Sequence, residues 1–125
     1  MKSKWAEYEG KTVLYMDLSN FKENIRGFEE EITTAIKTLG PRMYEQPLSS
    51  VLVLVDLRNT IMTQKATSFL SEAIKKKKKY VQRTAVVGMT GIRKVFLDYF
   101  SMLASSETGS FEDTESAVKW LLRTK

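Results

Sequence analysis

The pattern of apolar residues predicts a central strand near the middle of the chain. Val51–Val55 is a run of five apolar residues that ends at the carboxylate of Asp56. A short apolar run without polar alternation is typical of a strand that is covered on both faces. We therefore expect Val51–Asp56 to lie in the middle of a sheet, with helices above and below it.

Two strands and a helix are predicted before this central strand. Lys4–Glu9 and Thr12–Leu18 are β-rich and flank Gly10, a spacing that indicates a hairpin with Gly10 at a positive φ angle. Asn20 and Glu23 resemble a capping box, which predicts the start of a helix. The apolar face of that helix would consist of Phe21, Ile25, Phe28, Ile32, Ile36 and Leu39.

The first helix is expected to end at Gly40-Pro41, because glycine and proline both terminate helices. Arg42–Ser50 shows no periodicity and is predicted to be a loop that leads into the central strand.

After the central strand, Thr63 is the predicted N-cap of a second helix, which ends in a run of lysines. Its apolar face would consist of Ala66, Phe69, Leu70, Ala73 and Ile74. Tyr80–Val87 is predicted to be a strand, and Ile92–Leu103 a helix with a wide apolar face. A short edge strand up to Phe111 and a final helix that Asp113 caps complete the expected order.

This order of elements predicts an α/β fold with an open, mainly parallel sheet, an antiparallel N-terminal hairpin strand and about four flanking helices. A length of 125 residues, 42% of them hydrophobic, suits one domain over residues 1–125. The N-terminus is too polar for a signal peptide, and no apolar run approaches the roughly 18 residues of a membrane span. We expect a cytoplasmic protein.

The composition narrows the classes of function. The chain has no Cys and no His, which excludes disulfides, Cys or His ligation of zinc and haem, Cys–His and Ser–His nucleophile pairs, and imidazole acid–base catalysis. The net charge of +5 favours an anionic partner such as nucleic acid, a phospholipid surface or an acidic protein face.

Four sequence segments resemble the sulfate transporter and anti-sigma factor antagonist (STAS) superfamily, and most closely its small stand-alone SpoIIAA-like proteins. The segments are TVLYMDLSN, SVLVLVDLRN, YVQRTAVVGMTGIRKVFL and FEDTESAVKWLL. The resemblance spans nearly the whole chain and implies an open, largely parallel sheet flanked by helices. It also implies similarity in fold to anti-sigma antagonists and to CRAL-TRIO lipid-transfer domains, with hydrophobic-ligand binding or membrane association as the expected functions.

One segment departs from the pattern of the sporulation antagonists, which carry a phosphorylatable Asp-Ser-Ser-Gly-like motif after the third strand. The chain has IMTQKATS in this region. Thr63, Thr67 and Ser68 supply hydroxyl groups, but none of them lies in the matching motif. A phosphorylation switch of the antagonist type is therefore not expected from the resemblance.

Two predicted strands end at an Asp within similar sequence segments, Asp17 in MDLSN and Asp56 in VDLRN. The carboxyl edge of a parallel sheet is where ligands bind in open α/β folds. A magnesium-dependent enzyme that uses both carboxylates is one hypothesis, although further acidic residues would be needed. The favoured interpretation is that each carboxylate accepts hydrogen bonds from loop amides. No catalytic residue, metal or cofactor is predicted.

Two basic segments are candidates for anion or membrane contact. The lysine run comprises Lys75, Lys76, Lys77, Lys78 and Lys79, and the second segment comprises Arg93 and Lys94 after the loop Gly88–Gly91. Acidic headgroups suit the lysine run better than a specific nucleic acid, because only Tyr80 could serve as a stacking platform. The alternatives are a solvated helix end for the run and a plain strand-to-helix turn for the loop.

An apolar cleft is predicted between the helix that starts at Thr63 and the helix over Ile92–Leu103. The candidate ligand-binding residues are Leu57, Met62, Phe69, Phe96, Tyr99, Phe100 and Leu103. Core packing of the wide apolar face is the alternative. The first functional hypothesis is a non-enzymatic domain that binds a hydrophobic or lipid-like ligand here and associates with anionic membrane, peripherally on the inner face.

The second functional hypothesis is a regulatory protein-interaction module of the anti-sigma antagonist type. It would contact a protein partner through the loop Arg58–Thr63 and the helix that follows.

Overall fold

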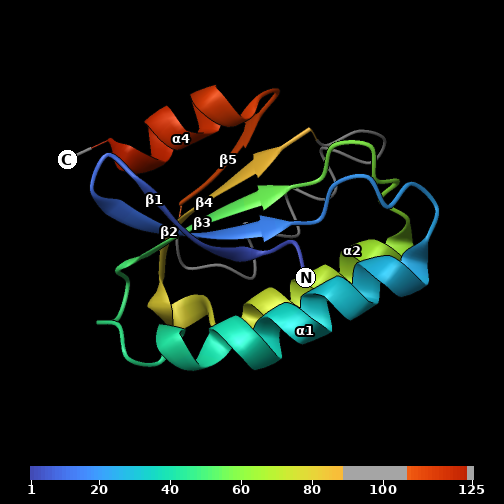
Figure 1. Ribbon diagram of the computed structural model, residues 1–125, viewed down its shortest axis with the longest axis horizontal. Helices are drawn as coiled ribbons and strands as arrows, with labels where there is room; N and C mark the ends of the chain where they lie inside the picture. Colours follow the sequence, from blue (N-terminus) through green and yellow to red (C-terminus); the bar gives the residue numbers. More distant parts are fainter. Residues whose placement is uncertain (89–106, 124–125) are drawn as a thin grey trace.

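In the computed structural model, residues 1–88 and 107–123 are described and form one five-stranded sheet between two layers of helices (Figure 1). The strands lie in sequence order and are β1 (Lys4–Tyr8), β2 (Lys11–Asp17), β3 (Val51–Asp56), β4 (Val81–Val87) and β5 (Glu107–Phe111). β1 is antiparallel to β2, and each later pair of neighbours is parallel. The predicted open, mainly parallel sheet with an N-terminal hairpin is confirmed.

The described helices are α1 (Ile25–Met43), α2 (Gln64–Lys75), the 3-10 helix η1 (Lys78–Tyr80) and α4 (Thr114–Leu122). α1 and α2 lie side by side on one face of the sheet, and α4 covers the other face (Figure 1). The helix predicted over Ile92–Leu103 falls outside the described residues.

The predicted hairpin turn and the predicted caps of α2 and α4 are confirmed. Glu9 and Gly10 have φ angles of 49° and 83°, as a tight two-residue hairpin turn requires. Thr63 caps α2 by accepting a 3.1 Å hydrogen bond from the backbone N–H of Ala66. Asp113 caps α4 in the same way, through the N–H of Ser116 at 2.7 Å.

The start predicted for α1 is wrong. Asn20 has a φ of 64° and its N–H donates to the carbonyl of Arg58, so the chain is still pairing with the segment after β3 at this point. The helix begins only at Ile25, with Asn24 as the N-cap that accepts a hydrogen bond from Gly27. A contact across distant parts of the chain has displaced a good local capping pattern.

The end predicted for α1 is also wrong, because the helix runs through Gly40-Pro41 to Met43. Proline in the last turn removes one hydrogen-bond donor and crowds the preceding turn, so its cost is confined to the end of the helix. Met43 is 2% exposed and packs in the core, so burial of its side chain stabilises the extra turn.

β3 divides the core into two layers. All six of its residues are buried, as predicted. Val53 and Val55 pack with the residues beneath α1 and α2, while Leu52 and Leu54 pack with Ala117 and Leu121 of α4. The two faces of β3 therefore pack against two different helix layers. Burial on both faces accounts for the unbroken apolar run of this strand.

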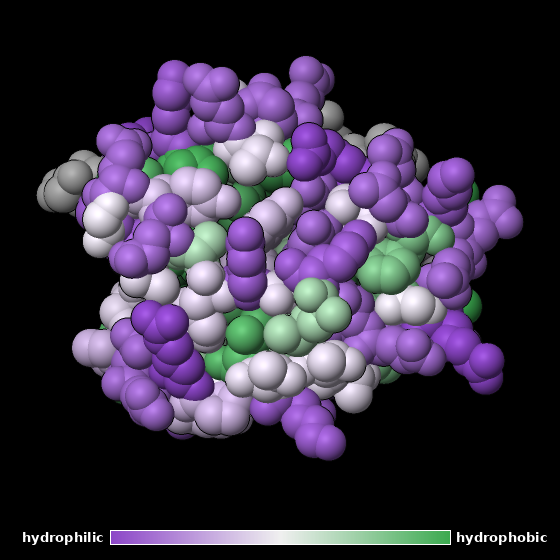
Figure 2. Space-filling view, viewed as in Figure 1, coloured by the Kyte–Doolittle hydropathy of each residue, from purple (hydrophilic) through white to green (hydrophobic). Residues whose placement is uncertain are grey.

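The outer surface is mostly hydrophilic on the face drawn in Figure 2, where apolar atoms show only in small separate areas. Within residues 1–88 and 107–123, no helix has the length and hydropathy that crossing a bilayer would demand.

Candidate functional site

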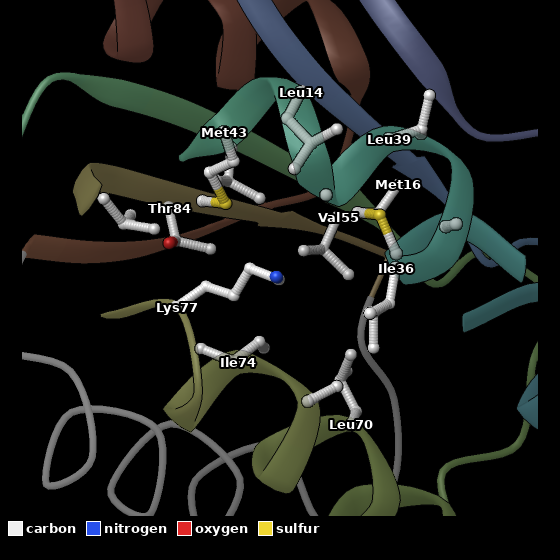
Figure 3. Close-up of a pocket in the computed structure, with 15 residues that line it drawn as sticks. Leu14, Met16, Ile36, Leu39, Met43, Val55, Leu70, Ile74, Lys77 and Thr84 are labelled. Atoms are coloured by element: carbon white, nitrogen blue, oxygen red, sulfur yellow. The ribbon is translucent and has the colours of Figure 1, made fainter. Parts of the chain in front are cut away.

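An apolar cavity of about 70 Å³ lies between α1, α2 and the sheet. Its wall includes Met16 and Val55 from the sheet, Ile36 and Met43 from α1, and Leu70 and Ile74 from α2 (Figure 3). These residues belong to the apolar stripes that make each helix pack on the sheet. The cavity therefore lies within the main hydrophobic core, where the two helices meet the sheet.

Small residues leave this space unfilled. Ala35, Gly40 and Ala73 line the cavity from the two helices. Core voids larger than a water molecule are few in natural domains, because filling them gains contact energy. A void at the meeting point of two helices and a sheet is therefore a candidate binding site.

Lys77 provides the charged group of the cavity wall. Its side chain extends from the end of α2, and Figure 3 shows its Nζ directed toward the apolar residues of the cavity. Nζ donates a 2.7 Å hydrogen bond to the hydroxyl of Tyr44 and lies 4.0 Å from the centre of that ring. The hydrogen bond from Lys77 and the positive charge of the lysines lower the pKa of the Tyr44 hydroxyl.

The rest of the predicted lysine run is arranged around the end of α2. Lys75 is its last residue and Lys76 its C-cap, while Lys78 and Lys79 lie in η1. All four are exposed and none lines the cavity, whereas Lys77 is half-buried. The run therefore combines an exposed cationic surface with a single inward ammonium group.

The predicted ligand-binding residues that are described do not line this cavity. Leu57 is 0% exposed and Met62 is 5% exposed, and both pack in the core. Phe69 is half-buried and borders a shallow hollow beside α1. The residues that fall outside the described ranges are Phe96, Tyr99, Phe100 and Leu103, together with Arg93 and Lys94. The cleft between α2 and Ile92–Leu103 stays a prediction.

The cavity between α1 and α2 was not predicted from the sequence, because the sequence reasoning weighted large aromatic residues. The signal that indicates this cavity is instead the presence of small residues within the apolar stripes of the helices. Ala35 and Gly40 occupy such positions in α1, and Ala73 does so in α2.

The carboxylates of the sheet edge are held by hydrogen bonds, as the favoured interpretation predicted. Asp17 accepts from the N–H of Ser19 at 3.1 Å, and Asp56 from the N–H of Arg58 at 3.0 Å. Asp56 is 1% exposed, and its carboxylate also accepts hydrogen bonds from the Arg58 guanidinium at 2.7 Å and from the Tyr15 hydroxyl at 3.1 Å. The segments MDLSN and VDLRN therefore have the same local structure at the ends of adjacent parallel strands: in each, the Asp carboxylate accepts from the N–H two residues later.

The electrostatics of this edge favour an ion pair. Burial raises the pKa of Asp56, but the hydrogen bonds and charge of Arg58 outweigh it and hold that pKa below its ordinary value. Burial and the neighbouring carboxylates raise the pKa of Tyr15. In the part of the chain that the structure describes, no three acidic residues gather as a metal site would require.

Gly88 serves backbone geometry in the predicted anion loop. Its φ is +72°, and a Cβ atom there would lie 2.2 Å from Cγ of Arg58. The rest of the loop, together with Arg93 and Lys94, lies outside the described residues, so anion binding there stays a prediction.

The hydroxyl groups of IMTQKATS have different surroundings. Thr63 caps α2, Thr67 is buried at 7% exposure, and Ser68 is exposed.

The comparisons with known proteins address the fold. No protein-family model matches the sequence, and no curated protein matches it. A solved structure of an uncharacterised protein from the DUF3478 family of Shewanella loihica PV-4, which has a SpoIIAA-like fold, is similar with a TM-score of 0.70. The similarity covers 95% of this chain and 91% of that one at 15% sequence identity. The chain therefore has a SpoIIAA-like α/β fold, as its sequence resemblance implied.

Proposed function

We propose that this protein is a non-enzymatic binding domain that holds a hydrophobic or amphiphilic ligand between α1, α2 and the sheet. The observation that carries the proposal is the apolar cavity, in which small residues replace the larger ones that would close the core. Its wall is mainly apolar and includes Met16 and Met43, whose flexible side chains adapt to ligands of different shape.

The size of the cavity sets a condition on binding. A volume of about 70 Å³ is less than half of the roughly 150 Å³ engineered void that takes up benzene in another protein. A flexible chain of several methylene groups therefore requires α1 and α2 to move apart. Each methylene group that enters contributes about 0.8 kcal/mol, so affinity should rise with chain length until the space is filled.

Peripheral binding to anionic membrane is the second part of the proposal. Tyr44 is 55% exposed and Leu48 is 65% exposed, and both follow α1. Tyr44 contacts Lys77, and the backbone N–H of Ser49, next to Leu48, donates to the carbonyl of Lys79. Apolar and aromatic side chains beside several cations suit the interface of an anionic bilayer. Because Lys77 both contacts Tyr44 and lines the cavity, a membrane on this surface would lie next to the cavity.

Ligand binding is tested by titrating the purified protein with 1-decanol and sodium decanoate and by native mass spectrometry. We expect saturable one-to-one binding of at least one of the two, with affinity that rises from octyl to decyl chains. Absence of binding by both compounds would refute the cavity function.

Membrane binding is tested separately, by flotation with vesicles of phosphatidylglycerol or phosphatidylcholine at low and high salt. Selective flotation with phosphatidylglycerol at low salt is expected, and it should weaken in Leu48→Asp. Equal behaviour with both vesicles would contradict this part of the proposal.

A regulatory protein-interaction module is a second candidate function, which the exposure of Ile61 favours. Ile61 is 51% exposed in the loop Arg58–Thr63, where an apolar side chain could contact a protein partner. Affinity capture from native extract would test this function with Ile61→Asp as the comparison. A partner that binds both forms equally would contradict it.

A further inference from the structure

We propose that Lys77 and Tyr44 form a head-group site that selects aliphatic carboxylates over neutral chains of equal length. The inference deepens the proposed ligand-binding function and rests on it. It adds the chemical class of the ligand, a chain with one terminal carboxylate, and the direction in which the chain lies. The carboxylate would be at the end of α2 and the tail between the helices.

The first support is the charge balance around Lys77. Its Nζ bonds to the hydroxyl of Tyr44, which is a neutral partner. Within the described residues, no carboxylate lies within 4.0 Å of this ammonium group. An ammonium group has three N–H donors, so two of them remain for a ligand. A cation that faces an apolar cavity without an acidic partner is suited to a ligand that brings its own negative charge.

The second support is the donor that Tyr44 keeps. The Tyr44 oxygen accepts the N–H of Lys77, which leaves the phenolic O–H free to donate to another group. A carboxylate has two oxygens and can accept from both neighbouring donors. The hydrogen bond from Lys77 and the positive lysines also lower the pKa of Tyr44, as expected where negative charge is stabilised.

The third support is the way Lys77 is held at the cavity. Its side chain crosses from the end of α2 to α1, where Gly40 makes room for it. A Cβ atom at position 40 would lie 3.1 Å from Nζ and 3.4 Å from Cε of Lys77. Glycine inside a helix is less favourable than alanine, so a packing reason for it is expected. The space above Gly40 places the ammonium group between the helices.

The surrounding cations also favour the binding of a carboxylate group. Lys76 and Lys79 are exposed around the end of α2, and their positive charge acts on the Tyr44 hydroxyl beside the cavity. Met16 and Leu70 offer the tail an aliphatic environment in the wall of the cavity. Figure 3 shows the polar end of Lys77 facing this aliphatic wall, an arrangement that matches a molecule with one charged end.

The experiment measures the affinities of decanoate and 1-decanol by calorimetry at pH 8, where decanoate is ionised. It compares the natural chain with Lys77→Met, Tyr44→Phe and the matched control Lys78→Met. Lys78 lies in the same lysine run but is exposed and does not line the cavity. Circular dichroism and thermal unfolding establish that each variant is folded.

We expect the natural chain to prefer decanoate to decanol. Lys77→Met should lose about tenfold or more in decanoate affinity, within the range of charge-assisted hydrogen bonds, and keep its decanol affinity within about threefold. Tyr44→Phe should lose less for decanoate and nothing for decanol, and Lys78→Met should match the natural chain.

Equal binding of decanoate and decanol by the natural chain would overturn the head-group site but leave the binding function intact. Retained decanoate affinity in Lys77→Met would also overturn it, and if that variant fails to fold, the same criterion applies to Tyr44→Phe. Failure of both compounds to bind would instead refute the proposed function itself.

Discussion

Filling the cavity should stabilise the protein and abolish ligand binding in one substitution. Ala35 lies in α1, is 2% exposed and lines the cavity, so Ala35→Leu adds three carbon atoms toward the empty space. At about 24 cal/mol for each Å³ of void, complete filling of about 70 Å³ corresponds to a gain of about 1.7 kcal/mol. This figure is an upper limit, because any strained rotamer subtracts from it.

The gain is measured by urea unfolding, which should show a higher midpoint with an unchanged slope. For a domain of this size, the same gain raises the melting temperature by up to about 6 °C. Decanol and decanoate should no longer bind, since the added side chain occupies the space of the ligand. Lys37→Leu is the matched control because Lys37 is exposed on the same helix and does not line the cavity. It should change the free energy of unfolding by less than about 0.5 kcal/mol and leave binding unchanged.

Two outcomes would refute the reasoning about this cavity. A stabilised Ala35→Leu protein that still binds decanol with full affinity would show that the ligand lies elsewhere. A strongly destabilised variant would show that the space cannot accept a side chain and is therefore no binding volume. Either result would favour the cleft predicted between α2 and Ile92–Leu103 as the ligand-binding site.

The remaining predictions concern stability, measured by urea unfolding. Arg58→Met should cost about 2 kcal/mol at pH 7, because it leaves the buried carboxylate of Asp56 without its ion pair while Arg58 itself is half exposed. Gly88→Ala should cost more than about 2 kcal/mol, since it combines a φ of +72° with a 2.2 Å approach to Cγ of Arg58. Thr63→Ala should cost about 1 kcal/mol through loss of the α2 cap.

The Arg58→Met prediction also has a pH dependence. In the natural chain the folded pKa of Asp56 is below its unfolded value of about 3.9. The ion pair therefore stabilises the folded state above that pH, and the contribution is lost as the pH falls through the folded pKa. The stability difference between the two proteins should therefore shrink as the pH falls below about 4. A difference that stays constant would contradict the assignment, and adding Asp56→Asn to Arg58→Met should cause little further loss.

Matched variants serve as controls for the other two changes. Gly10→Ala also replaces a glycine at positive φ, but no atom lies within 4 Å of its Cβ position, so it should cost less than Gly88→Ala. Equal losses would show that the contact with Arg58 is unimportant. Thr63→Ser keeps the hydroxyl group and should retain most of the stability. A loss equal to that of Thr63→Ala would argue against the cap.

Local sequence signals determined much of the fold. The composition of the apolar run Val51–Val55 was sufficient to predict a strand that is buried on both faces. The caps at Thr63 and Asp113 were predictable because a capping side chain bonds to an amide three residues away. The same holds for Gly10, whose turn is closed by the two strands beside it.

Tertiary structure decided the bounds of α1 and the candidate site. Asn20 is a good capping residue, but its backbone pairs with Arg58, a partner that no local pattern reveals. The lysine run was visible in the sequence, yet only packing shows that Lys77 turns inward over Gly40 to reach Tyr44 of another element. The cavity is likewise a property of the space left where two helices meet a sheet. Sequence periodicity shows which side chains face the core, whereas the volume left unfilled depends on how distant surfaces fit together.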